Sequence, residues 1–176
     1  MRSLGVMAGE RCDECGADLG VPDVAVAAAG LRELTPGFRA AVAGLSEDAF
    51  RTKPTPGVWS LLEYLGHVRD LTRFHGAIMR DALRAEPGTE VRQPAVDIDA
   101  VVADLGYNQE DPAVVLDAVE ANLARFADRI ESLTPAEQAV TMVRIGETVP
   151  VAFLAGNVLH ETTHHLLDVR RLAARS

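Results

Sequence analysis

Apolar residues recur at helical spacing in four segments of the chain. In the first, from about residue 24 to 43, they lie three or four residues apart, which places them on one face of an α-helix: Leu31, Leu34, Phe38, Val42 and Leu45. A second helix is expected over about 60–84, directly after a connector at 53–60 whose prolines disfavour helix. Ser60 and Glu63 have the spacing of a capping box, which supports a helix start there.

The third segment has the clearest pattern. Its apolar residues keep a three-four spacing over about 18 positions: Leu116, Val119, Leu123, Phe126, Ile130 and Leu133. A fourth helix is expected from about Pro150 to Ala174, because proline is accepted in a first helical turn. Residues 86–112 look irregular apart from a short helical turn at 98–105, and weak alternation at 139–150 predicts a small β-hairpin.

These elements predict an all-α protein, a four-helix bundle with a small β-hairpin before the last helix. The chain has 176 residues, of which 48% are hydrophobic, and this suits one domain with one core. Residues 1–22 are Gly-rich and aperiodic. We therefore expect an N-terminal arm at 1–22 and the bundle at 23–176.

Charge and hydropathy exclude several functions. The formal net charge is −9, so the chain as a whole should be repelled by nucleic acid and by anionic membrane surfaces. No stretch approaches the roughly 18 consecutive apolar residues of a membrane helix, and the first residues lack the apolar run of a signal peptide. We expect a cytoplasmic protein that binds neither nucleic acid nor membrane.

Histidines carry the most informative chemistry. His160 and His164 are four residues apart, so on a helix they can grip one divalent ion. His67, from the second helix, would supply a third imidazole and leave coordination positions open for water or substrate. Each histidine has an ordinary reading too, as a hydrogen-bonded polar group, and only their combination in a bundle favours a metal site. His75 and His165 have weaker claims by spacing.

Residues 160–164 also match the zinc-protease pattern H-E-x-x-H. That interpretation is disfavoured, because the few residues that follow offer no third ligand beyond Asp168. Glu161 is then expected to be solvated or to support a ligand by hydrogen bonding. Asp168 could accept the spare N–H of a ligand histidine, or form an exposed salt bridge with Arg170 or Arg171.

The cysteines Cys12 and Cys15 form a single C-x-x-C in the arm. One pair supplies half of a four-ligand zinc site. Three interpretations stay open: a half-site completed by histidine or by a dimer mate, a redox dithiol, or two unremarkable reduced thiols.

The segment 59–67 reads Trp-Ser-Leu-Leu-Glu-Tyr-Leu-Gly-His, and 160–168 reads His-Glu-Thr-Thr-His-His-Leu-Leu-Asp. In its W-S-x-x-E-x-x-x-H and H-x-x-x-H elements the chain resembles the DinB-like metalloprotein superfamily, from about residue 25 onward. The resemblance implies a four-helix bundle, often a homodimer, that binds zinc, nickel or iron at the positions of His67, His160 and His164. The C-x-x-C arm is not part of the general family pattern.

Relatives in that superfamily include mycothiol-dependent maleylpyruvate isomerase and thiol S-transferases. We therefore expect a metal-dependent enzyme for a small-molecule substrate, zinc being the first choice of metal, which uses a low-molecular-weight thiol such as mycothiol in S-transfer or isomerisation. Arg170 and Arg171 are candidates for binding a substrate carboxylate. The alternatives are a metal-dependent hydrolase and a non-enzymatic metal-binding or redox-sensing stress protein.

Overall fold

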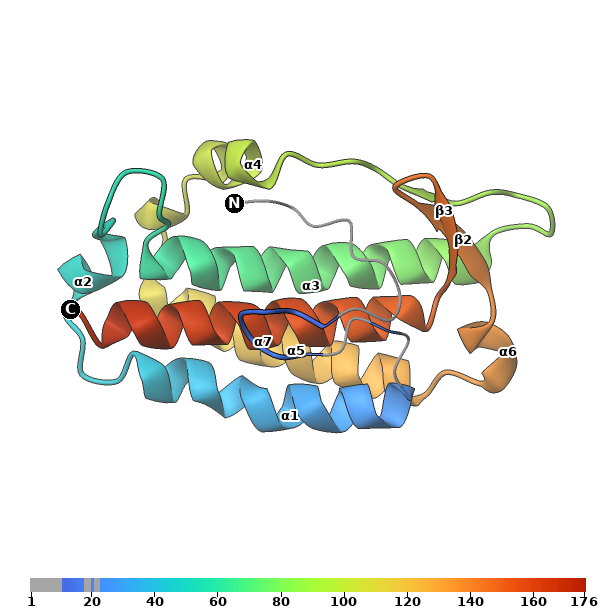
Figure 1. The fold of residues 1–176 in the computed structure, drawn as a ribbon, viewed down its shortest axis with the longest axis horizontal. Coiled ribbons are helices and arrows are strands. Elements are labelled where there is room, and N and C mark those ends of the chain that lie inside the picture. Colours follow the sequence, from blue (N-terminus) through green and yellow to red (C-terminus); the bar gives the residue numbers. More distant parts are fainter. Residues whose placement is uncertain (1–10, 18–19, 21–22) are drawn as a thin grey trace.

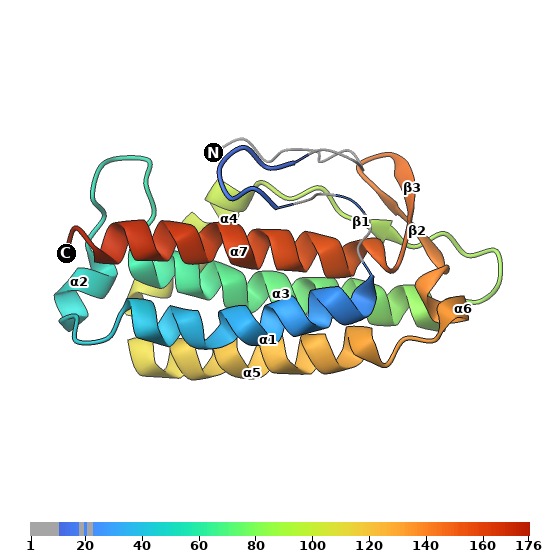
Figure 2. The same cartoon turned by 60° about the horizontal axis from the view of Figure 1, so that its bottom comes forward.

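The computed structural model describes residues 11–17, 20 and 23–176. Four long helices dominate it: α1 (Val24–Ala41), α3 (Leu61–Arg84), α5 (Pro112–Glu131) and α7 (Phe153–Ala173). Helix α1 packs against α5 and α7, and α3 packs against the same two, so α5 and α7 lie on opposite sides of the bundle (Figures 1 and 2). The predicted four-helix bundle is confirmed.

One continuous core fills the space between these helices. The apolar stripe predicted for the third helix lies in it, because each of its residues is at most 6% exposed: Leu116, Val119, Leu123, Phe126 and Ile130 in α5, and Leu133 just beyond the end of that helix. Leu31 and Phe38 from α1 and Leu154 and Leu166 from α7 meet them in the same cluster.

Local chemistry explains where the helices begin. The Asp23 carboxylate accepts from the Ala25 amide at the start of α1, and Ser60 with Glu63 forms the predicted capping box at the start of α3. The start of the last helix differs from the prediction. Pro150 ends a strand, and α7 begins at Phe153.

Short elements join the long ones: α2 (Glu47–Arg51), α4 (Ile98–Leu105), a 3₁₀ turn η1 (Tyr107–Gln109) and α6 (Pro135–Gln138). Strands β2 (Thr141–Arg144) and β3 (Glu147–Pro150) pair antiparallel as the predicted hairpin. Ile145 and Gly146 both have positive φ, the backbone that a two-residue hairpin turn requires. Strand β1 (Arg92–Gln93), which was not predicted, pairs parallel with β2.

Gly66 in α3 lets the 3₁₀ turn approach the helix closely. A Cβ built on Gly66 would lie 2.5 Å from Cδ1 of the Tyr107 ring, which is only 2% exposed. The Tyr107 hydroxyl donates to Asp70 on the same helix. These contacts fix η1 against α3 one residue from His67.

The described part of the N-terminal arm lies along the outward side of α7 (Figure 2). Residues 11–17 form a tight loop in which the Gly16 amide donates to the Cys12 carbonyl and the Cys12 amide to the Ala17 carbonyl. The rest of the predicted arm, at 1–10, 18–19 and 21–22, lies outside the described residues. Within the described ranges, none of the helices has the length and apolar character needed to cross a bilayer.

Candidate metal centre and its neighbouring cluster

A short stretch of α7 presents polar side chains in two directions. Glu161 and His165 lie with His67 of α3, whereas His160 and His164 lie with the cysteines of the arm. Successive helical residues are about 100° apart around the axis, so pairs offset by one residue occupy different faces. Residues 160–165 of α7 therefore contribute two side chains to each of two separate groups of metal-ligating residues.

The first group consists of His67, Glu161 and His165. Each offers one ligand atom, and these atoms all lie within 4.8 Å of one another. Nε2 of His165 is 3.4 Å from Oε2 of Glu161. Two ligand atoms of a tetrahedral ion, each about 2.0–2.1 Å from it, are themselves roughly 3.4 Å apart. Two imidazoles and a carboxylate are a donor set that divalent metals accept, so the residues fit such an ion.

His67 is held in an apolar setting. It is 7% exposed, and its ring centroid lies 5.1 Å from that of Trp59 and 4.9 Å from that of His165. Burial lowers the pKa of His67 to about 3, with a further contribution from the neighbouring His165. The imidazole is therefore neutral at physiological pH, which is the form that binds metal.

Glu161 and His165 support one another electrostatically. Burial opposes ionisation of Glu161, but the hydrogen bonds from His160 and His165 outweigh it and hold the pKa of this carboxyl well below its usual range. Burial also opposes protonation of His165, yet Asp168 and Glu161 together raise its pKa. The two carboxylates thus favour positive charge at this position, which a divalent ion would also supply.

Asp168 orients His165. Nδ1 of His165 is 3.3 Å from Oδ2 of Asp168, so this nitrogen can donate to the carboxylate and leave Nε2 free to face Glu161. Metal-binding histidines are commonly fixed in this way by a carboxylate on the far nitrogen. The same Asp168 oxygen lies 3.7 Å from Nε2 of His164.

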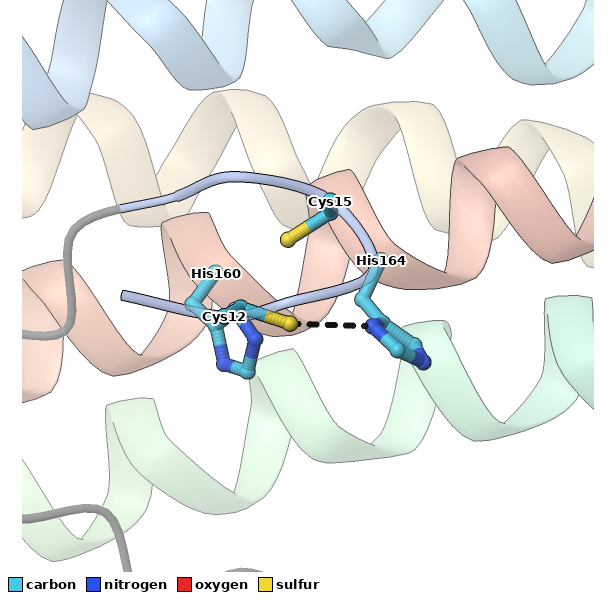
Figure 3. A group of neighbouring side chains, drawn as sticks. All are labelled: Cys12, Cys15, His160 and His164. Atoms are coloured by element: carbon cyan, nitrogen blue, oxygen red, sulfur yellow. Dashed lines mark hydrogen bonds between the residues drawn. The ribbon is translucent and has the colours of Figure 1, made fainter. Parts of the chain in front are cut away.

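The second group consists of Cys12, Cys15, His160 and His164, whose ligand atoms also lie within 4.8 Å of one another. Figure 3 shows the two sulfur atoms of the arm loop directed toward the two imidazoles of α7. The Cys12 sulfur is 3.7 Å from Nδ1 of His164. Both cysteines are free thiols, and Cys12 is buried.

The loop favours the thiolate form of Cys12. Burial of this thiol opposes ionisation, but a hydrogen bond from the Cys15 backbone, supported by His160, the Glu14 backbone and His164, lowers its pKa to about 6. Burial and the neighbouring Cys12 raise the pKa of Cys15. One sulfur of the pair is thus prepared to act as a ligand or nucleophile near neutral pH.

A pocket of about 270 Å³ opens beside both groups. Its lining combines two aromatic rings, an apolar rim and acidic groups: Glu14, Gly57, Val58, Trp59, Tyr64, His164 and Asp168. Trp59 and Tyr64 also touch the first group, because their ring centroids lie 6.1 and 5.6 Å from that of His165. The aromatic wall of the pocket therefore packs against His165 of the first group.

The two predicted substrate-binding arginines diverge. Arg171 approaches the pocket, with NH1 3.5 Å from Glu14 and 3.9 Å from Asp168. Arg170 points elsewhere, since NH2 would lie 3.1 Å from a Cβ built on Gly37 in α1. Both are exposed at the surface.

The structure does not gather the predicted trio of His67, His160 and His164 into one group. It joins His67 with Glu161 and His165, and it leaves the H-x-x-x-H pair to the cysteines. The sequence contains a signal for this arrangement, but it was not used in the prediction. Glu161 and His165 form a second i,i+4 pair, E-x-x-x-H, displaced by one residue from the first.

His75, the remaining histidine, takes part in neither group. Asn157 of α7 donates to its Nε2 at 3.0 Å, and its Nδ1 bonds to the Leu71 carbonyl at 2.9 Å. It is a hydrogen-bonded histidine of the bundle interior.

These features define a four-helix-bundle protein with a candidate centre for a divalent ion between two of its helices. The model of the DinB superfamily matches residues 31–169, and the chain belongs to that superfamily. The matched region contains every histidine of the two groups and excludes the cysteine arm.

Two solved structures share the fold. YfiT from Bacillus subtilis, described as a probable metal-dependent hydrolase with an unusual four-helix bundle topology, has a TM-score of 0.73 and 17% identity, covering 86% of each chain. The mycothiol-dependent maleylpyruvate isomerase has a TM-score of 0.65 and 15% identity over 84% of this chain. The match spans 61% of that isomerase. No curated protein matches.

Proposed function

We propose that the protein is a metal-dependent enzyme whose divalent ion is held by His67, Glu161 and His165. The observation that carries this proposal is the convergence of these three buried or half-buried ligands beside an aromatic-walled pocket. Three protein ligands leave coordination positions for a reacting molecule, which is typical of catalytic rather than structural sites. Zinc is the first choice of metal, and nickel or iron suits the same donor set.

Each residue of the centre has a role that follows from its surroundings. His67 stays neutral because of its burial, and the neighbouring His160 and His165 favour the anionic form of Glu161. Asp168 keeps Nε2 of His165 turned toward Glu161. The chemistry that a divalent ion supplies in such a setting is to favour the deprotonated, nucleophilic form of a thiol or of water.

We further propose that the nucleophile is a low-molecular-weight thiol of the mycothiol type, used in S-transfer or isomerisation. The pocket supports a neutral, hydroxyl-rich carrier, because Glu14 and Asp168 can accept from hydroxyl groups while Trp59 and Tyr64 offer ring faces. The same carboxylates would repel a carboxylate-bearing thiol. Arg171, the cation at the rim, is already engaged by both carboxylates.

The test is conjugation of mycothiol to monochlorobimane by the metal-loaded protein. In this reaction the thiol sulfur forms a bond to carbon, the carbon–chlorine bond breaks, chloride leaves and the thiol proton passes to solvent. We expect His67→Ala and His165→Ala to lose both metal and conjugation. Thr163→Ala is the matched control on α7, because its hydroxyl donates to the Leu159 carbonyl of the same helix.

The outcomes separate the proposals. Conjugation that persists at full rate in metal-free protein would contradict a metal-dependent mechanism. Ester or amide hydrolysis without any thiol, dependent on the same three ligands, would replace the thiol reaction by the hydrolase alternative. Metal bound by the same three ligands, with neither conjugation nor hydrolysis detectable in the loaded protein, would leave a metal-binding protein that is not an enzyme.

We also propose, in keeping with the family resemblance, that the protein works in the cytoplasm as a homodimer. Cell fractionation tests the location, and light scattering of the purified protein tests the mass. A monomeric mass at micromolar concentration would contradict the dimer.

A further inference from the structure

We propose that Cys12, Cys15, His160 and His164 form a second metal site, a closed Cys2His2 zinc site that fastens the N-terminal arm to α7. The site is separate from the His67 centre, since the two groups share no ligand. The proposal does not depend on the proposed function. It concerns residues of the arm that lie outside the region matched by the family model.

The spacing of the ligand atoms suits zinc. With Zn–S of about 2.3 Å and Zn–N of about 2.0–2.1 Å, a tetrahedral angle places sulfur and nitrogen roughly 3.6 Å apart. The Cys12 sulfur and Nδ1 of His164 are 3.7 Å apart. All four candidate atoms lie within 4.8 Å of one another (Figure 3), so small side-chain rotations bring them around one ion.

His160 gives an independent sign of a missing partner. Its Nε2 is buried and has no hydrogen-bond partner among the described residues, although burial of an unsatisfied imidazole nitrogen is costly. Its other nitrogen, Nδ1, lies 3.6 Å from Oε1 of Glu161. A zinc ion would satisfy the unpartnered nitrogen.

His164 repeats this arrangement with the nitrogens exchanged. Nδ1 faces the Cys12 sulfur, while Nε2 lies 3.7 Å from Asp168 and 3.8 Å from Glu14. In both histidines one nitrogen lies near a carboxylate, which leaves the other available to a metal ion. Ligand histidines of zinc sites are oriented by carboxylates in this way.

The arm loop is built to hold two sulfurs together. The Gly16 amide closes the turn on the Cys12 carbonyl, and Gly16 has a φ of 72°, which glycine adopts without strain. The cysteines are three residues apart, the spacing of C-x-x-C half-sites. The two histidines four apart on α7 supply the other half, in place of the second cysteine pair that the sequence lacks.

Four protein ligands leave no coordination position for substrate, so this zinc would be structural. The position of this zinc ion would also affect the pocket. Glu14 lies between the two cysteines, lines the pocket and reaches toward His164 and Arg171. Zinc binding would therefore hold Glu14 in place as part of the pocket wall.

Metal analysis of the purified full chain tests the proposal. We expect the Cys12→Ser/Cys15→Ser variant to lose one zinc per chain. The His67→Ala/His165→Ala variant should keep the zinc that the cysteines and His160 and His164 hold. Cobalt substituted into the latter variant should show the intense visible bands of tetrahedral Co²⁺ and a thiolate-to-cobalt charge-transfer band, and both should vanish in the cysteine variant. Neither cysteine lies in a helix, so the cysteine variant should retain the bundle.

Three results would overturn the second site. One is a single ion per chain that both variants lose, because that ion would draw ligands from both groups. Another is reduced protein whose zinc content the cysteine substitutions leave unchanged. The third is a Cys12–Cys15 disulfide, detected by mass spectrometry, in protein that was prepared under reducing conditions and contains no zinc. If the His67 centre alone failed to bind metal, the unsubstituted chain and the His67→Ala/His165→Ala variant would each hold one zinc, and the cysteine variant would hold none. The two proposals therefore fail distinguishably.

Trypsin provides a second readout. Arg11 is exposed and directly precedes Cys12. We expect cleavage after Arg11 to be at least tenfold slower in zinc-loaded protein than after chelation, and equally fast with and without zinc in the Cys12→Ser/Cys15→Ser variant. Equal cleavage of the unsubstituted protein with and without zinc would contradict a fastened arm.

Discussion

Glu161 and His165 face one another one turn apart on α7, with Oε2 of the carboxylate 3.4 Å from Nε2 of the imidazole. Both side chains turn toward α3, where His67 completes the group. The pair follows directly from helical geometry, because residues four apart are neighbours on one face. In the proposed centre this glutamate is a metal ligand, whereas the H-E-x-x-H pattern would make it a catalytic base.

Replacing Glu161 therefore tests the centre directly. We expect Glu161→Gln to weaken metal binding at the His67 centre by more than about tenfold, because the substitution removes the negative charge from the ligand set. Competition with a chromogenic chelator measures the affinity. The Cys12→Ser/Cys15→Ser background confines the measurement to the His67 centre.

Two controls accompany this measurement. Thr163→Ala should bind metal as the unsubstituted chain does. In the same background His164→Ala should also retain the ion, since His164 lies in the other group. If His164→Ala released the ion while Glu161→Gln kept it, the ligands would instead be His67 with the H-x-x-x-H pair.

Asp168 should act on the metal through His165. Asp168→Asn removes the carboxylate that accepts from Nδ1 of His165, and we expect metal affinity to fall by about 10–100-fold without loss of the site at saturating metal. Titration of zinc into the chelated protein gives both the affinity and the final stoichiometry. An unchanged affinity would mean that packing against Trp59 and Tyr64 alone orients the ring.

Glycines of α3 allow a test of packing near the site. A methyl group at Gly66 would collide with the Tyr107 ring at 2.5 Å, whereas at Gly76 the nearest atom belongs to Phe126 at 3.9 Å. We expect Gly66→Ala to destabilise the protein by about 1–3 kcal/mol. Gly76→Ala, the control, should stabilise it by up to about 1 kcal/mol. Urea unfolding measures both, and equal effects would contradict the close approach of η1.

His75 should make stability depend on pH. Burial lowers its pKa below the ordinary value of 6.5, so the unfolded chain binds a proton that the folded chain does not. The resulting stability is present above about pH 6.5 and is lost as the pH falls below it, at no more than about 1.4 kcal/mol per pH unit. Two charges also act on the pKa of His75, and in opposite directions: Glu161 raises it and Arg144 lowers it.

Comparison with His75→Gln isolates this contribution. The free energy of unfolding of chelated protein, measured by urea titration between pH 8 and pH 5, should fall less steeply for the variant. Parallel curves would show that His75 is not the group that titrates. Glutamine can still donate to the Leu71 carbonyl and accept from Asn157, so the fold should survive the change.

Periodicity was sufficient to predict the bundle. The three-four spacing in α5 and the capping box at Ser60 encode their helices locally, within a few residues. Strand β1 could not be predicted, because its two residues carry no pattern of their own and are strands only through pairing with β2. The start of α7 was misplaced because Pro150 suits both a first helical turn and an edge strand.

The grouping of the site residues was harder to predict. Sequence spacing identifies both i,i+4 pairs on α7, but the rotation of that helix decides which pair meets His67. That rotation is fixed by packing against α1 and α3, which no local pattern encodes. Cys12 presents the same difficulty, since its neighbours His160 and His164 are distant in sequence and become close only when the arm lies along α7.

The contact between Cys12 and His164 joins positions 152 residues apart. A metal bridge there would close nearly the whole chain into a loop, and cross-links that close long loops remove the most conformational entropy from the unfolded chain. The resistance of this protein to unfolding would then rise and fall with the supply of zinc. A cell short of zinc would hold a version of it that proteases degrade sooner.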